Sequence, residues 1–164
     1  MCARFEIDTG VIEESVSRSY SHNPGVFMLA SGNVRPSNPS LVIAGHHGHL
    51  HTGIMRWGLP RFDCKGLVIN TRSETAFEKQ MVTFSLPDQE IIWMAGIFDT
   101  EYRYSVLTTA ANESITKFHD RMPVLLKTTD LEPWLFDSTV TASIMEKKMP
   151  VLEHRQENEQ ISLF

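Results

Sequence analysis

The 164-residue sequence predicts a mixed α+β fold, built mainly on antiparallel strands within a single domain that spans residues 1–164. Short runs rich in β-branched and aromatic residues recur along the chain, and Gly, Pro, Asn and Asp separate them. The stretches with helical periodicity are short and flank these runs. Hydrophobic residues make up 41% of the chain and charged residues 21%, a balance that is typical of a globular domain and argues against disorder.

The first half of the chain is expected to form one helix among several short strands. Asp8 or Thr9 can cap a helix that runs to about Tyr20. Two prolines in the stretch 31–40 predict an irregular loop, and the glycines and histidines near residue 47 predict a hairpin turn. The expected strands are 2–7, 26–30, 41–44, 50–58 and 67–70, with a second loop at 59–66.

The second half is expected to contain a hairpin followed by short helices. Strongly β-prone residues at 90–98 and 102–109 predict two strands around a turn. Thr129 and Glu132 have the spacing of a capping box for a helix through Phe136. The other expected elements are a short helix in 71–80, a short helix, a turn and an apolar segment in 111–126, a small helix at 138–145, and a polar tail.

Charge and cysteine content restrict the class of protein. The net charge is −5, from 15 basic and 20 acidic residues, whereas a dedicated nucleic-acid binder is usually basic. Arginines nevertheless gather in the motifs below, so a local positive face is compatible with this total. Two cysteines provide no disulfide framework, and a cytoplasmic location is expected. Apolar runs such as Ile91–Phe98 are too short to cross a bilayer, so no membrane association is expected.

Cys2 lies directly after the initiator methionine in the opening MCARF. If Met1 is removed, Cys2 has a free α-amine beside its thiol, and this aminothiol can close a thiazolidine ring on an aldehyde. The amine titrates at about 7.7–8.0 and the thiol at about 8.5, so the surroundings can activate either group. On position alone, the favoured interpretation is that Cys2 is a small buried residue at the start of a strand.

The segment GHHGHLH is the candidate metal site of the sequence. His47, His49 and His51 would share one face of a strand, and imidazole is a common zinc ligand. No Cys or carboxylate adjoins them in the sequence to complete such a site. A polar hairpin tip is therefore the favoured interpretation, and no metal or other cofactor is expected.

Three further segments contain groups that can bind nucleic acid or transfer protons. In VINTRSET, Asn70 and Arg72 would stand at a helix N-terminus that attracts phosphate, although on these residues alone an Asn cap with a surface arginine is the favoured interpretation. In FHDRMP, His119 is an acid–base candidate near neutral pH, but most such His–Asp pairs are structural. In MRWGLP, Trp57 beside Arg56 can stack on a base or lie in the core.

Together, and in this order, these segments resemble the motifs of the SRAP (SOS-response-associated peptidase) family. The matching segments are MCARF, MRWGLP at 55–60, NTRSETAFEK at 70–79, and the pair TTAANE and HDRMP within 108–123. The resemblance covers most of the chain to about residue 136. It implies a barrel-like core with short flanking helices, in a protein that cross-links to abasic sites in single-stranded DNA and thereby protects the lesion in the DNA damage response.

The resemblance also assigns chemistry to three residues. Cys2 would be the nucleophile after Met1 is removed, because a ring-opened abasic sugar has the free aldehyde that an aminothiol needs. Asn70 would hold the amine of Cys2 or the sugar. His119 would assist ring opening and proton transfer. Such a reaction modifies the protein itself, so whether the protein is an enzyme is left open.

Five more residues would bind DNA by the same resemblance. Arg4, Arg72 and Arg121 would contact phosphates, and the loop at Pro36 would border the strand. Phe62 occupies the position of a tryptophan that packs against DNA in the family. The expected partner is single-stranded DNA with an abasic site, bound by a monomer without an obligate protein partner, and nucleoid-associated in a bacterium or phage.

The sequence departs from the family pattern in one serious respect. Family members have a GFYEW-like segment whose glutamate donates a proton, and nothing like it follows NTRSETAFEK here. Glu74 and Glu101 are the nearest substitutes along the chain. General acid–base help contributes about 10²–10⁴-fold, so its loss would slow cross-linking without abolishing it. Ala3 in place of the usual glycine is a milder change.

Three alternative functions are compatible with the sequence. A degenerate family member would bind single-stranded DNA without covalent chemistry, in keeping with the missing glutamate and the charge of −5. A peptidase or other hydrolase would use Cys2 with His119, but the sequence shows no oxyanion hole. An interaction module would hold a metal through its histidines.

Overall fold

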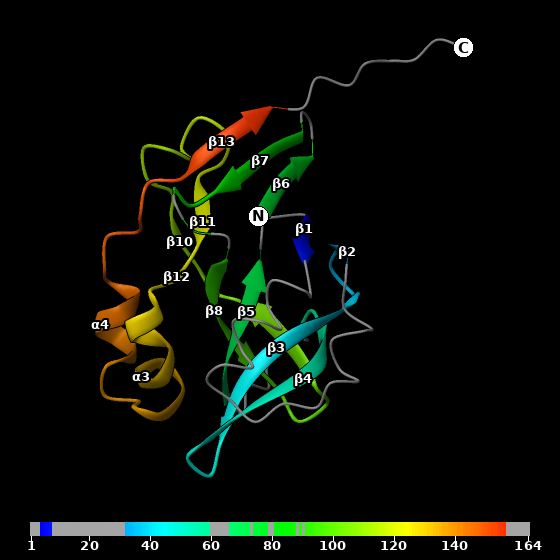
Figure 1. The fold of residues 1–164 in the computed structure, drawn as a ribbon, viewed down its shortest axis with the longest axis vertical. Helices are drawn as coiled ribbons and strands as arrows, with labels where there is room; N and C mark the ends of the chain where they lie inside the picture. The colour runs from blue at the N-terminus through cyan, green and yellow to red at the C-terminus, as the bar shows by residue number, and fades with distance from the viewer. Residues whose placement is uncertain are drawn as a thin grey trace.

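The computed structural model describes residues 4–7, 32–59, 66–72, 74–78, 81–87, 89 and 91–156, and Figure 1 shows their arrangement. Side chains are described for residues 33–59, 82–87, 89 and 91–156. The expected helix at 8–20, the strand at 26–30 and most of the loop at 59–66 lie outside the described residues.

A curled, mainly antiparallel sheet forms the barrel-like half of the fold. Its strand order is β12-β8-β5-β3-β4-β9, and β9 pairs a second time with β8, so the sheet curls back on itself. Tyr104 of β9 is the fully buried residue that pairs with both Trp57 and Phe98. The strands are β3 (Pro39–His46), β4 (His49–Trp57), β5 (Gly66–Arg72), β8 (Ile92–Phe98), β9 (Arg103–Val106) and β12 (Leu125–Leu126).

A second sheet of five antiparallel strands lies beside the first. Its order is β13-β7-β6-β1-β2, with β1 between β6 and β2. The strands are β1 (Arg4–Ile7), β2 (Gly32–Val34), β6 (Glu74–Glu78), β7 (Met81–Ser85) and β13 (Glu153–Gln156). Two of the passages of the chain between the sheets, after β2 and after β5, lie next to β1, because β2 and β6 both pair with β1.

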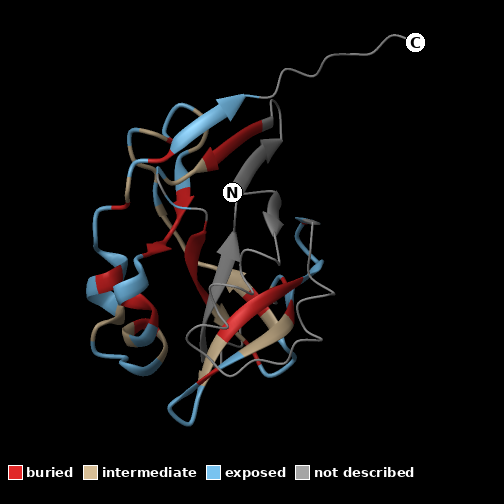
Figure 2. Ribbon diagram, in the orientation of Figure 1, coloured by how far each residue is buried: buried red, intermediate tan, exposed pale blue. Residues whose placement is uncertain are grey.

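A small hairpin and short helices complete the described fold. Strands β10 (Thr108–Ala110) and β11 (Arg121–Pro123) pair in antiparallel. The helices are η1 (Thr128–Asp130), α3 (Leu131–Phe136) and α4 (Thr141–Met145). Helix α3 packs against β3 and β5, and its Trp134 is fully buried. Figure 2 shows buried residues along β3, β7, β8 and α3, and an exposed β13.

The turn after β8 is organised by Asp99, whose side chain is buried. Its Oδ1 accepts the N–H groups of Glu101 and Arg103 at 2.9 and 3.0 Å, and its Oδ2 accepts Nε–H of Arg103 at 2.7 Å. Burial alone would raise the pKa of this carboxyl, but the hydrogen bonds from Arg103 and Glu101 outweigh it and hold the pKa below its usual range.

The α+β class and most of the predicted strands in the described residues are confirmed. The strands expected at 41–44, 50–58, 67–70, 90–98 and 102–109 are all present, the last as β9 and β10. The hairpin turn is confirmed at His47 and Gly48, whose φ angles of 48° and 76° give the left-handed pair that a two-residue turn requires. The small helix at 138–145 is present as α4.

Four local predictions are wrong, and strand pairing explains two of them, at 71–80 and at 31–40. The stretch 71–80 is not a helix, because β5 continues to Arg72 and β6 pairs with both β1 and β7. The loop at 31–40 contains β2 and the start of β3 around a short turn. The helix expected after residue 111 is a series of turns. Asp130, rather than Thr129, accepts a cap hydrogen bond, from the N–H of Lys127 at 3.3 Å.

Candidate functional site

Three of the expected site residues, Arg4, Asn70 and Arg72, are on strands that meet where the two sheets adjoin. Arg4 is on β1, which pairs with β6 and lies beside β5. Asn70 and Arg72 are near the end of β5, immediately before the chain passes to β6. In Figure 1, β1 and the arrowhead of β5 lie close to the same passage. Cys2 and Phe62 lie outside the described residues.

A continuous row of paired residues connects β5 to the segment that follows His119. Asn70 pairs with Met94 of β8, and Met94 pairs on its other side with Leu125 of β12. The N–H of Ala95 donates to the carbonyl of Val124 at 2.9 Å. The end of β5 and the segment immediately after the HDRMP motif are therefore held on the two sides of one strand, β8. Because Arg72 is in a strand, the expected phosphate site at a helix N-terminus is wrong.

The imidazole of His119 is fixed by its own neighbours in the chain. Its Nδ1 accepts the N–H of Arg121 at 2.9 Å, and Oδ1 of Asp120 lies 2.8 Å from the same nitrogen. These two partners require opposite protonation states of Nδ1. Asp120 is 86% exposed, and exposed ion pairs contribute little, so the bond from Arg121 dominates in the neutral ring. The proton of neutral His119 is then on Nε2, which makes Nε2–H a donor.

The guanidinium of Arg121 is anchored on the neighbouring strand. Its Nη2 donates to the carbonyl oxygen and to Oγ1 of Thr108 at 2.6 and 2.9 Å, and its Nε donates to the same Oγ1 at 3.3 Å. Arg121 nevertheless remains exposed. A charge that is oriented yet accessible can bind a phosphate with little further ordering.

Pro36 lies in an ordered turn that joins β2 to β3. Asn38 donates its N–H to the carbonyl of Arg35 at 2.9 Å, and Ser37 donates its N–H to the carbonyl of Trp57 at 2.7 Å. Ser37 has φ of 75°, which tightens this turn. Pro36 is exposed at the turn, beside the strand that pairs with β1.

Backbone hydrogen bonds bring two more arginines and a tyrosine to this end of β4. Arg56 donates its N–H to the carbonyl of Tyr102 at 2.9 Å, and Trp57 donates its N–H to the carbonyl of Asn38 at 2.9 Å. Arg35 and Arg56 are exposed, and Tyr102 is 70% exposed. Trp57 itself is buried in the core, so the base-stacking interpretation of Trp57 is wrong.

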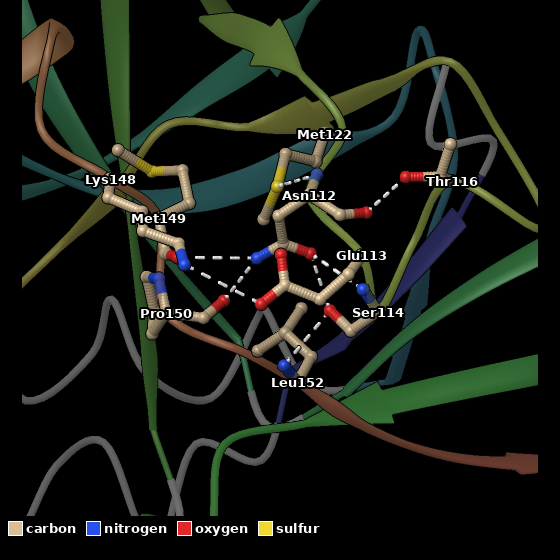
Figure 3. A network of polar contacts seen from close by, with 9 residues as sticks. All are labelled: Asn112, Glu113, Ser114, Thr116, Met122, Lys148, Met149, Pro150 and Leu152. Atoms are coloured by element: carbon tan, nitrogen blue, oxygen red, sulfur yellow. Dashed lines mark hydrogen bonds and ion pairs between the residues drawn. The ribbon is translucent and has the colours of Figure 1, made fainter.

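Asn112 is at the centre of a polar network to which the sequence assigned no role. Asn112 donates both amide hydrogens, to the carbonyls of Met149 and Pro150 at 3.2 and 2.7 Å. Its Oδ1 accepts the N–H and the hydroxyl of Ser114 at 3.0 and 2.6 Å, and Oγ of Ser114 accepts the N–H of Leu152 at 3.1 Å. Figure 3 shows Asn112 between these partners. The motif TTAANE, which contains Asn112, is the sequence feature that could have indicated this network.

The two carboxylates named as substitutes for the missing glutamate lie in different surroundings. Glu74 is on β6, paired with Glu6 of β1. Glu101 is in the turn after β8, at the end of β8 remote from β12. Glu78 pairs directly with Met81, so β6 and β7 form a tight hairpin where the family has its additional segment. Of the two, only Glu74 is on a strand next to β1.

The histidine hairpin does not form a metal centre within the described part of the chain. The rings of His46 and His47 have centroids 4.0 Å apart, and those of His46 and His51 are 6.1 Å apart. Among the described residues, no group of three His, Cys, Asp or Glu side chains is arranged to hold a metal ion. Within the same residues, no helix is long and apolar enough to span a membrane.

This chain is similar to a curated protein and to solved structures. It is 25% identical over 178 aligned residues to the abasic site processing protein YedK of Escherichia coli (strain K12), with 82% of this chain and 79% of that protein covered. A crystal structure of a protein from Bacteroides thetaiotaomicron superposes with a TM-score of 0.75 at 16% identity, covering 96% of this chain and 93% of that one.

A second crystal structure, of a protein from Bordetella bronchiseptica, has a TM-score of 0.73 at 13% identity and covers 96% of this chain and all of the other. At such identities the two structures establish the fold. The family model named SOS response associated peptidase (SRAP) matches residues 78–162, just over half of the chain. This protein therefore belongs to the SRAP family.

Proposed function

We propose that this protein recognises abasic sites in single-stranded DNA in the cytoplasm and links to them covalently through Cys2, after loss of Met1. Membership of the SRAP family and the similarity to an abasic site processing protein support the lesion as the target. The geometry of His119 supports the chemistry, because its ring is held by Arg121 beside an anchored positive charge. That arrangement is the observation on which the proposal rests.

The proposed reaction balances without an oxidant or reductant. The α-amine of Cys2 adds to the aldehyde carbon of the ring-opened sugar and one water leaves, which gives an imine. The thiol sulfur then adds to the imine carbon, its proton passes to the nitrogen, and a thiazolidine results. Each step needs a proton moved at the sugar oxygens or the nitrogen. Nε2–H of His119 is the donor that we assign to this transfer.

The DNA is bound by arginines and turns of the same face. Arg4, Arg72 and Arg121 would contact phosphates, Pro36 would border the DNA strand, and Phe62 would pack against the DNA. Asn70 would orient the amine of Cys2 or the sugar. Arg121 is the best supported of these residues, because its guanidinium is both oriented by Thr108 and exposed. A monomer suffices for this arrangement.

One observation favours a second function, namely binding of DNA without covalent chemistry. The tight pairing of Glu78 with Met81 replaces the family segment that contains the catalytic glutamate. If Glu74 does not supply the missing acid, the face would still bind single-stranded DNA through its arginines. The protein would then shield the lesion reversibly.

The test mixes Met1-processed protein with a single-stranded oligonucleotide that contains one abasic site, followed by a denaturing gel. Mass spectrometry first confirms that Met1 is absent. The matched controls are Cys2→Ala protein and an oligonucleotide with a tetrahydrofuran abasic analogue, which has the same gap but no aldehyde. Glu74→Gln is tested in parallel.

A denaturant-stable band that requires both Cys2 and the aldehyde is the expected result. Binding of both oligonucleotides with equal affinity and no stable band would contradict the covalent proposal and support the reversible binder. A band that survives in Cys2→Ala would contradict the assignment of Cys2. A slower reaction of Glu74→Gln with unchanged DNA affinity would identify Glu74 as the replacement acid.

A further inference from the structure

The loop that contains His119 is joined to a distant segment of the chain. The His119 loop, residues 111–120, joins β10 to β11. The distant segment is the C-terminal strap, residues 148–154, which runs from the end of α4 into β13. Some 37 or 38 positions separate the hydrogen-bonded residues of the two segments.

Asn112 provides the first connection between loop and strap. Both hydrogens of its amide are used, on the carbonyls of Met149 and Pro150, and its oxygen is used by Ser114. Figure 3 shows this side chain pointing from the loop to the strap. The side chain of Asn112 is partly buried. Loss of its amide group would leave the carbonyls of Met149 and Pro150 without these donors, and this would cost free energy.

Ser114 and Met149 extend the same connection. Oγ of Ser114 accepts the N–H of Leu152 at 3.1 Å, and Sδ of Met149 accepts the N–H of Leu125 at 3.1 Å. Through Met149 the strap is thus joined to β12 as well as to the loop. Lys148 and Glu113 form an ion pair at 3.6 Å, but both are exposed, so it contributes little.

An aromatic contact provides an independent connection next to His119. The ring of Phe118 lies 5.1 Å from the ring of His154, in an edge-to-face arrangement, and 5.4 Å from the ring of Phe84. Phe84 is fully buried on β7, whose strand pairs with β13 at His154. Phe118, one residue before His119, therefore packs against two paired residues of the five-stranded sheet, Phe84 on β7 and His154 on β13, where the strap enters that sheet.

We propose that Asn112 and His154 are positioning residues, through which the C-terminal strap orients His119 for proton transfer. The inference rests on the proposed function of His119 and adds the strap to the reacting site. Within the loop, backbone hydrogen bonds form short turns from Asn112 to Ile115 and Thr116 and from Ile115 to Phe118 and His119. The N–H of Ala111 also donates to the carbonyl of Asp120 at 3.0 Å, which closes the base of the loop. The bonds from Asn112 to the strap add a connection to a distant part of the chain.

Positioning of this kind changes rate rather than affinity. A catalytic group that moves by about 1 Å can lose about 10²-fold in rate, whereas the arginines that bind the DNA stay in place. A role in stability alone would lower the amount of folded protein and would leave the rate of the folded fraction unchanged. The two roles are therefore distinguishable by experiment.

The test compares His154→Ala with His154→Phe and adds Asn112→Asp. Phenylalanine keeps an aromatic ring against Phe118 and removes the imidazole, so it is the matched control for packing. Aspartate keeps the acceptor for Ser114 but removes both donors to the strap. For each protein, the single-turnover rate of cross-linking is measured against DNA concentration, and amide hydrogen exchange is measured by NMR.

The expected result is a maximal rate about 10-fold lower in His154→Ala and about 10²-fold lower in Asn112→Asp, with DNA affinity within about twofold of wild type. His154→Phe is expected to restore the rate to within about twofold. The Arg121 amide, which is bonded to His119, is expected to exchange faster in the two impaired proteins. The amides of Ala95 and Leu107 are expected to keep their protection.

Two outcomes would overturn the inference. One is an unchanged rate and unchanged exchange at Arg121 in both His154→Ala and Asn112→Asp. The other is equal acceleration of exchange at Arg121 and Ala95, which would indicate general destabilisation. If wild-type protein forms no adduct, the proposed function fails, and exchange at Arg121 alone decides whether the strap orients His119.

Discussion

Nδ1 of His119 accepts the backbone N–H of Arg121 at 2.9 Å, in competition with a carboxylate oxygen of Asp120 at 2.8 Å. Only an unprotonated Nδ1 can accept the N–H, and only a protonated one can donate to Asp120. The two contacts therefore cannot both be hydrogen bonds at one time, and because Asp120 is exposed, the bond from Arg121 is the one that orients the neutral ring.

Replacement of His119 by asparagine separates its structural from its chemical role. The amide oxygen of asparagine can accept the N–H of Arg121 as Nδ1 does, but the side chain does not titrate. His119→Asn is expected to keep wild-type stability and DNA affinity and to lose about 10²-fold or more in the rate of cross-linking. Denaturant unfolding and single-turnover kinetics measure the two effects.

The control for this variant is His119→Ala, which also removes the acceptor. It is expected to lose stability as well as rate, because the N–H of Arg121 loses its partner, at a cost of about 1 kcal/mol. Equal rates for wild type and His119→Asn would exclude His119 from the chemistry.

The strands of the barrel-like sheet could be predicted because the local residue pattern of each one is typical of a strand. Alternation and turn residues marked β3 and β4, and the apolar run at 91–98 marked β8. The stretch 71–80 could not be predicted, because its composition favours a helix and its pairing with β1 and β7 is set by distant residues. Tertiary pairing overrode local propensity there.

Individual site residues with reactive groups could be predicted from the sequence, but the contacts between them could not. His119 and Arg121 could be named from their chemistry and motif, whereas the bond from Arg121 to Thr108 and that from Asn112 to Pro150 depend on the fold. An asparagine that binds carbonyls 38 positions away has no local signature. The roles of Cys2 and Phe62 stay predictions.

Gly45 is expected to tolerate no side chain, because helix α3 packs directly on it. A Cβ at this position would lie 2.6 Å from Cε1 of Phe136 and 3.1 Å from Cβ of Leu135. The ring of Phe136 can move, but Cβ of Leu135 cannot without a shift of the helix. Gly45→Ala is expected to lower the free energy of unfolding by about 1–3 kcal/mol in urea denaturation.

Gly53 provides the matched position for this experiment. It lies on β4, paired with Val42 of β3, and a Cβ there would meet nothing within 4 Å. Gly53→Ala is expected to change stability by less than about 1 kcal/mol and can even be stabilising. Equal destabilisation by the two substitutions would contradict a specific contact with α3.

Asp99 is expected to make stability depend on pH in the acid range. Its pKa in the folded protein lies below the ordinary value of 3.8, because burial, which raises it, is outweighed by the bonds from Arg103 and Glu101. The ionised carboxylate therefore stabilises the folded state. This contribution is complete above the ordinary value and is lost as the pH falls through the lower folded value.

The measurement compares wild type with Asp99→Asn in urea at neutral pH and at a pH below that ordinary value. The substitution keeps the size of the side chain but presents an uncharged amide to Nε of Arg103. The variant is expected to be less stable at neutral pH, and the difference is expected to shrink in acid. A difference that stays constant with pH would show that the charge of Asp99 does not matter.

The effect of salt on DNA binding is expected to distinguish the role of Arg121 from that of Thr108. A phosphate contact releases about 0.7 counterion from single-stranded DNA, so Arg121→Ala should reduce the slope of log K against log salt by about 0.7 and weaken binding at low salt. Thr108→Val removes the Oγ1 acceptor of the guanidinium and leaves the charge. It should weaken binding severalfold with an unchanged slope, because an unanchored arginine must be ordered on binding.

Fluorescence anisotropy over a range of salt concentrations measures both the affinity and the slope. If Thr108→Val changes the slope as much as Arg121→Ala does, the hydroxyl itself supports the phosphate contact, and anchoring of the guanidinium is not its role.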